Sequence, residues 1–176
     1  MNELPKRKHI RIPQYDYSAP GAYFITICST NREEIFWANR RGELCSIKNE
    51  NRLESVGADI IRPQDTPLSY AGVIVEKSVL QIPEHYGNIS VDKYCIMPDH
   101  VHIILSIRTD EDGRMISAPT VSTVVGSMKR WVSKQLGRSI WQKSFYEHTI
   151  RNQQDYDEIW EYIENNPLKY IQKRTP

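Results

Sequence analysis

Two histidines stand one residue apart in this chain, at the start of an apolar run that extends to residue 107. Alternate side chains of a strand point to the same face, so His100 and His102 would project side by side. Two neighbouring imidazoles can hold one metal ion, and a metal held on a strand can do chemistry. The same pair could instead lie on a solvated strand face without a ligand. The Pro98-Asp99 turn beside the pair favours the metal site.

The bulk composition is typical of a single folded domain. The chain has 176 residues, of which 39% are hydrophobic and 26% charged, and this length suits one domain. We predict a basic N-terminal arm at residues 1–20 and one domain at 21–176. The absence of a long apolar run or a signal-like N-terminus predicts no membrane segment and no secretion. Three widely spaced cysteines without a CxxC pair favour a reducing compartment. Together these features predict a cytoplasmic location.

Hydrophobic periodicity predicts the elements that must position the histidines. Strands are expected where β-branched and aromatic residues run together, at residues 23–29, 89–96 and 100–107. Helices are expected where apolar residues recur at helical spacing, at residues 71–86, 119–136 and from near 153 to about 167. A hairpin is expected within 34–54, and extended chain at 139–150. This order predicts an α+β fold of ferredoxin-like type, with an antiparallel sheet and helices packed on one face.

The last predicted helix carries a tyrosine at the margin of its apolar stripe. Tyr162 and Asn166 are four residues apart and therefore neighbours on one ridge of the helix. A half-buried tyrosine at such a margin is usually a packing residue, and an asparagine before Pro167 is usually a helix stop. Spacing alone leaves both the structural and the functional interpretation open.

Charge is unevenly distributed although the net charge is only +1. Residues 114–151 contain many basic residues and one acid, whereas residues 152–166 contain only acids among their charged residues. A basic segment beside an acidic one could be an ordinary solvated surface or a groove that follows a phosphate backbone. The candidate DNA-binding residues are Lys129, Arg130, Lys134, Lys143 and Arg151. Arg130 and Lys134 lie opposite the apolar stripe of their helix, so plain solvation competes strongly for those two.

Several motifs in this order resemble one enzyme family. The segment MPDHVHIIL resembles the HUH (histidine–hydrophobic–histidine) motif of the single-tyrosine transposases. Downstream, WQKSFYEHTIRN and YIENNP are similar to the branch called REP-associated tyrosine transposases. The likeness covers most of the chain from Tyr23 to Tyr170, except for residues 62–70, and Asp99 stands where the family more often has Asn. His148 and Arg151 match recurrent positions to which we assign no role.

The resemblance implies that residues 21–176 are a catalytic domain that nicks and joins single-stranded DNA. His100 and His102 match the family's metal ligands, Asn166 matches the third ligand, and Tyr162 matches the nucleophile. Tyr146, in the WQKSFYEHTIR motif, precedes the helix and does not match that tyrosine. The expected cofactor is Mg²⁺ or Mn²⁺, which polarises the phosphate. The expected product is a 5′-phosphotyrosine with a free 3′ hydroxyl.

The resemblance also implies partners and leaves rivals. The expected partners are single-stranded DNA hairpins or palindromes, with no membrane, and the protein is expected to be a monomer or homodimer. One rival is a hairpin-binding protein that has lost cleavage. A histidine-triad nucleotide hydrolase would need a third histidine, but the next position on the same face is Ile104. A zinc-structured domain is disfavoured because paired cysteines are missing.

Overall fold

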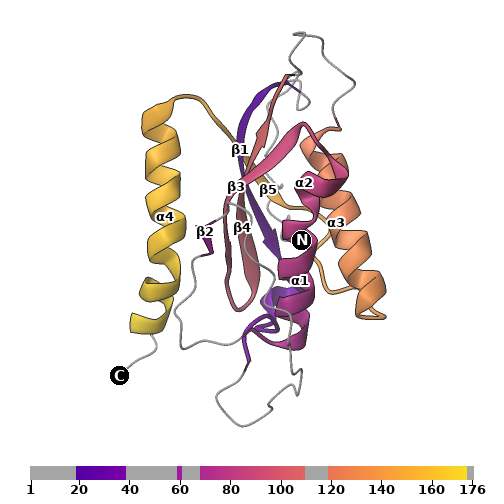
Figure 1. The fold of residues 1–176 in the computed structure, drawn as a ribbon. Helices are drawn as coiled ribbons and strands as arrows, with labels where there is room; N and C mark the ends of the chain where they lie inside the picture. Colours follow the sequence, from indigo (N-terminus) through magenta and orange to yellow (C-terminus); the bar gives the residue numbers. More distant parts are fainter. Residues whose placement is uncertain (1–18, 39–58, 61–67, 110–118, 174–176) are drawn as a thin grey trace, which may run out of the picture.

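A five-stranded sheet forms the centre of the structure, a computed structural model that describes residues 19–38, 59–60, 68–109 and 119–173 (Figure 1). The strands are β1 (Gly21–Cys28), β2 (Asp59–Ile60), β3 (Ile89–Ile96), β4 (His100–Ile107) and β5 (Tyr146–Ile150). Their order is β2-β3-β4-β1-β5. The short β2 pairs with β3 in parallel, and the other neighbours are antiparallel. The β1-α1-β3-β4-α3-β5 order confirms the predicted α+β, ferredoxin-like class.

The helices begin and end where the sequence provides local signals. They are α1 (Tyr70–Leu80), α2 (Ile82–His85), α3 (Val121–Gln135) and α4 (Gln153–Gln172), with a 3₁₀ turn, η1, at Thr30–Arg32. The side chains of Thr120 and Asn152 cap α3 and α4 by accepting from backbone N–H groups three residues ahead. Gly137, with φ of 66°, follows the end of α3. Within the described ranges, no helix is long and apolar enough to cross a membrane.

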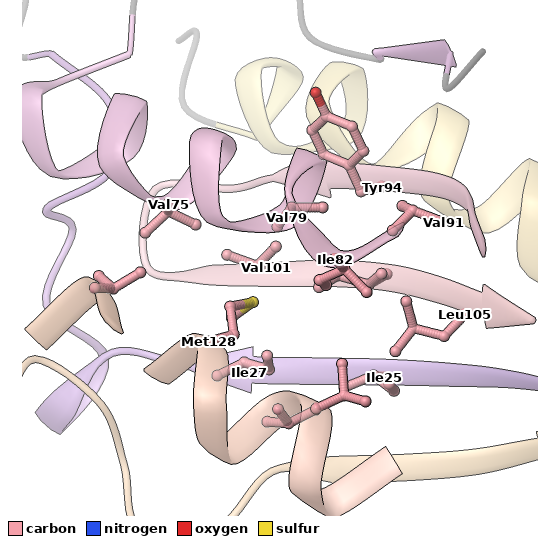
Figure 2. Close-up of a cluster of buried hydrophobic side chains, with 14 of the residues drawn as sticks. Ile25, Ile27, Val75, Val79, Ile82, Val91, Tyr94, Val101, Leu105 and Met128 are labelled. Atoms are coloured by element: carbon pink, nitrogen blue, oxygen red, sulfur yellow. The ribbon is translucent and has the colours of Figure 1, made fainter. Parts of the chain in front are cut away.

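One face of the sheet is covered by α1, α2 and α3 (Figure 1). Alternate residues of β1 and β4 point into this layer, where Ile25, Ile27 and Val101 are fully buried. Figure 2 shows these side chains against Val79 of α1 and Met128 of α3. The apolar stripe predicted for residues 119–136 is buried here, apart from the half-buried final residue. This layer is the main core of the protein.

The opposite face of the sheet is covered by α4 (Figure 1). The prediction that the helices pack on one face is therefore wrong in this respect. The physical reason lies in the other set of alternate strand residues, where Phe24, Cys95 and Ile104 are also apolar and need a cover. Ile163 of α4 is fully buried against them. Two apolar faces require two helical layers.

Helix α4 also runs past the proline that was expected to stop it. Pro167 lies inside the helix, which continues to Gln172. A proline inside a helix removes one hydrogen bond, but contacts beyond it hold the last turn in place. The Tyr170 hydroxyl donates to Glu34 over 2.7 Å, and its ring packs edge-on against Trp37. Most of the predicted arm at 1–20 and of the predicted hairpin within 34–54 lies outside the described residues.

Candidate active site

His100 and His102 converge on the face of the sheet that α4 covers. They occupy alternate positions of β4, opposite Cys28 and Thr26 of β1 respectively. Their Nε2 atoms are 3.0 Å apart, and their ring centroids are 4.5 Å apart. His102 is buried and stacks on Phe24, with centroids 5.3 Å apart, whereas His100 is half-buried. The side-by-side arrangement expected from strand alternation is confirmed.

The other nitrogen of each imidazole has a polar partner. His100 Nδ1 lies 2.5 Å from an Asp99 oxygen, and His102 Nδ1 lies 2.9 Å from the Thr26 hydroxyl. An ionised carboxylate can only accept, so Nδ1 of His100 carries the proton and Nε2 presents its lone pair. Metal-binding histidines are usually oriented by a partner of this kind.

Asp99 is in turn held by an arginine with an uncommon backbone conformation. Arg32 Nε donates to the second oxygen of Asp99 over 2.9 Å. Asn31 and Arg32 have φ values of 53° and 60°, in the left-handed region that side chains other than glycine seldom adopt. The conformational free energy that such backbone angles cost is tolerated where the surrounding structure fixes the conformation. The turn brings the guanidinium to Asp99, so Arg32, Asp99 and His100 form a chain of polar contacts.

Both imidazoles are neutral near neutral pH. Burial, followed by the nearby His100 and Arg32, lowers the pKa of His102 to about 3. Burial also lowers the pKa of His100, although its hydrogen bond and charge interaction with Asp99 act in the opposite direction. A neutral imidazole keeps the lone pair that a metal ion requires. The buried environment therefore favours the form of each histidine that can bind a metal.

Helix α4 adds an amide to the pair. Asn166 Nδ2 lies 3.0 Å from Nε2 of His102. Rotation of the amide by half a turn exchanges its nitrogen and oxygen, so that the oxygen faces His102 instead. Among the described residues, no three His, Cys, Asp or Glu side chains form a metal-binding group. Asn166 is the amide side chain that lies next to the two imidazoles in the described part of the chain.

The donor set fits a divalent ion. Two ligand atoms about 2.1 Å from one octahedral ion and at right angles to each other are about 3 Å apart, which matches the spacing of the two Nε2 atoms. Two imidazole nitrogens and an amide oxygen suit Mn²⁺, and Mg²⁺ with water in the remaining positions. His100, His102 and Asn166 would hold the ion.

Two exposed tyrosines flank this group, and they differ in what they contact. The ring of Tyr162 lies 5.3 Å from that of His102 and 6.1 Å from that of Phe24. The ring of Tyr146 lies 6.3 Å from that of Phe24. The side chains are exposed to a similar degree, 48% for Tyr162 and 47% for Tyr146. Tyr162 is therefore the tyrosine next to the histidines, and one helical turn separates it from Asn166.

A histidine of the WQKSFYEHTIR motif anchors the start of α4. His148 Nε2 lies 2.9 Å from one oxygen of Asp155 and 3.1 Å from the other. The backbone N–H of Arg151 donates to the same carboxylate. Because β5 carries His148 and α4 carries Asp155, this contact fixes the helix against the sheet. From the sequence, His148 and Arg151 matched recurrent positions but had no assigned role.

The five basic residues predicted to bind DNA lie on α3 and on the segments that flank β5. Lys129, Arg130 and Lys134 lie on α3, across the sheet from the histidines. The ammonium of Lys129 donates to the backbone oxygens of residues 142 and 144, and burial lowers its pKa. Lys143 and Arg151 are exposed before and after β5, the strand that carries Tyr146.

Sequence reasoning missed Phe24 and Thr26, which support His102. Their alternate positions in β1 indicated that they share one face of the sheet. Only the pairing of β1 with β4 brings them beside the histidine. A cavity of about 350 Å³ lies elsewhere, between α1–α2 and α3, with Ser78, His85 and Trp131 in its lining. It is on the opposite face of the sheet and forms no part of the histidine site.

Comparison with known proteins identifies the family. The family model described as "Transposase IS200 like" matches residues 74–166, more than half of the chain, including both histidines, Tyr162 and Asn166. The chain belongs to the IS200-like transposase family. The predicted family is confirmed, and with it the general assignment as a transposase-like protein.

Individual relatives agree with this assignment. An uncharacterized protein of Haemophilus influenzae is 28% identical over 185 residues, which cover 94% of this chain and 91% of that protein. The REP-associated tyrosine transposase of Escherichia coli is 30% identical over 81 residues, 46% of this chain and 45% of that protein. A solved REP-associated tyrosine transposase bound to a REP hairpin has a TM-score of 0.54 at 20% identity, covering 91% of this chain and 74% of that one. This last similarity supports the fold.

Proposed function

We propose that this transposase-family protein nicks and rejoins single-stranded DNA at hairpin-forming sites, with Tyr162 as the nucleophile. The observation that carries the proposal is the convergence of two imidazole lone pairs, an amide and an exposed tyrosine. His100 and His102 supply the imidazoles. Asn166 supplies the amide and Tyr162 the hydroxyl, one turn apart on α4. Family membership supports this combination.

The proposed reaction conserves the energy of the broken bond. The hydroxyl oxygen of Tyr162 attacks the phosphorus, and the P–O bond to the 3′ oxygen breaks. The proton of the tyrosine passes to water, and the leaving 3′ oxygen takes a proton from water to become a 3′ hydroxyl. The new ester joins Tyr162 to the 5′ phosphate, so attack by a 3′ hydroxyl reverses the step and joins strands. A bound divalent ion would polarise the phosphate oxygens and offset their charge.

We further propose that the site is completed by one chain. The apolar side of α4 packs on the same chain's sheet, with Ile163 fully buried. In this arrangement Tyr162 and Asn166 meet His102 of the same chain. The protein should therefore form its covalent intermediate as a monomer.

The test is a denaturing gel with end-labelled single-stranded DNA that carries a hairpin, in Mg²⁺ or Mn²⁺. A 3′ label should migrate with the protein, because the downstream fragment carries the phosphotyrosine. A 5′ label should give a free fragment whose 3′ hydroxyl a polymerase can extend. Tyr162→Phe should abolish both products while retaining the fold, and Tyr146→Phe should retain both. An adduct from Tyr162→Phe would refute the assignment, and a folded parent that binds DNA without an adduct would favour the binding-only rival.

A further inference from the structure

We propose that Tyr146 forms a stacking site for a nucleobase next to the cleaved phosphate. The proposal rests on the proposed function, because it assumes that single-stranded DNA reaches Tyr162. It assigns a separate role to the second tyrosine, that of holding one base of the strand while Tyr162 reacts.

The first observation is the direction in which Tyr146 points. In β5, Tyr146 pairs with Thr26 and His148 pairs with Phe24, and both belong to the set of residues that face α4. The ring of Tyr146 packs edge-on against Phe24, with an interplanar angle of 68°. A single T-shaped contact occupies at most one face of the tyrosine ring and leaves the other face available to another partner.

The second observation is exposure beside a buried site. Tyr146 is 47% exposed, whereas Phe24 is 8% and His102 is 3% exposed. Aromatic rings held open beside a phosphate-binding site stack on bases, because every base has a π-face.

The third observation is the position of Tyr146 relative to Tyr162. Both rings contact the same Phe24, Tyr162 at 6.1 Å and Tyr146 at 6.3 Å. A strand whose phosphate lies at Tyr162 therefore passes close to Tyr146. Exposed Lys143 and Arg151 lie before and after the same strand of the sheet, where they can neutralise neighbouring phosphates. The ligand class is a nucleobase of single-stranded DNA, without a requirement for one particular base.

Three variants separate stacking from packing. Tyr146→Phe keeps the flat ring, Tyr146→Leu keeps an apolar cover on Phe24 without a flat ring, and Tyr146→Ala removes both. Binding is measured in EDTA by fluorescence anisotropy, with the hairpin alone and with the same hairpin carrying a single-stranded extension. Thermal melting of each variant verifies folding.

We expect Leu and Ala at position 146 to weaken binding of the extended DNA by roughly 5- to 100-fold. The Phe variant should bind like the parent, and none of the three should change binding of the hairpin alone. An abasic nucleotide at one position of the extension should reproduce the loss, and combining it with Tyr146→Leu should add little. Quenching of 2-aminopurine at that position should disappear in the Leu variant.

The proposal is overturned if a folded Tyr146→Leu protein binds the extended DNA as tightly as the parent, or loses affinity equally for both DNAs. These results are distinguishable from a failure of the cleavage proposal. If the parent forms the adduct and the Tyr146 variants bind the extended DNA as the parent does, the stacking proposal is refuted and the cleavage proposal stands. A parent that shows the stacking effect but forms no adduct refutes cleavage alone.

Discussion

On the α1–α3 side of the sheet, β1 and β4 contribute buried apolar side chains, whereas on the α4 side the same strands contribute Thr26, His100 and His102. The first side has Ile25, Ile27, Val101, Ile103 and Leu105, each at most 1% exposed. The second side has an apolar half under α4 and a polar half beside Tyr162 and Asn166. Because alternate residues of one strand serve the two faces, stability and chemistry can be changed separately by neighbouring substitutions.

The largest loss of activity is expected from a substitution on the α4 side of the sheet. His102→Ala removes the imidazole that lies 3.0 Å from both His100 and Asn166. We expect the covalent adduct to disappear. Mn²⁺ binding, measured by isothermal titration calorimetry, should also be lost. The far-ultraviolet circular dichroism should remain that of the parent. If His102→Ala still binds Mn²⁺ with the parent's affinity, the proposed ligand set is wrong.

The matched control on the other face is the next residue. Ile103→Ala opens a cavity in the main core, where Ile103 is fully buried. We expect a loss of about 2–5 kcal/mol in the free energy of unfolding, measured in urea. At temperatures where the variant stays folded, Mn²⁺ affinity and adduct formation per folded molecule should be unchanged. A well-folded Ile103→Ala protein without activity would show that the two faces are not separable.

A smaller effect is expected one contact away from the metal ligands. Asp99→Ala leaves His100 in place but removes the carboxylate that holds its Nδ1–H. We expect Mn²⁺ affinity to fall by roughly 10- to 100-fold. Arg32→Ala, which removes the contact with Asp99, should produce a smaller loss in the same direction. Equal affinity in Asp99→Ala and the parent would exclude Asp99 from positioning the histidine.

The smallest effect is expected at the anchor of α4. His148→Ala removes the contact with Asp155, and both side chains are partly exposed, at 34% and 25%. We expect the protein to lose about 1 kcal/mol of stability in urea. Hydrogen exchange should become faster in the first turns of α4 and remain unchanged in α3. Gln153→Ala, which removes an exposed contact within the helix, is the control and should have a smaller effect.

The sequence was sufficient for features that depend on local periodicity. The same-face placement of His100 and His102 follows from the period of a strand, and the proximity of Tyr162 and Asn166 follows from the period of a helix. The core stripe of α3 was predicted for the same reason. Each of these inferences needs only residues within a few positions of one another.

Features that depend on pairing between distant segments were harder to predict. The second layer on the sheet could have been inferred from Phe24 and Ile104, because an apolar residue on each face needs a cover. The partners of the histidines could not, since Thr26 reaches His102 only through the register of β1 and β4. Helix α4 continues through Pro167 because Tyr170 donates a hydrogen bond to Glu34 and packs against Trp37. Both partners lie more than 130 positions earlier in the chain.

The alternation in β4 also has an evolutionary consequence. Insertion or deletion of one residue between His100 and Ile107 would turn every later side chain of the strand to the opposite face. Such a change would disrupt the core, and between His100 and His102 it would also separate the histidine pair, so it offers no gradual route to either a new fold or a new activity. Substitutions that preserve the spacing affect one face at a time. We therefore expect lineages of this gene to diverge in the apolar residues of β4 while the length of that segment stays fixed.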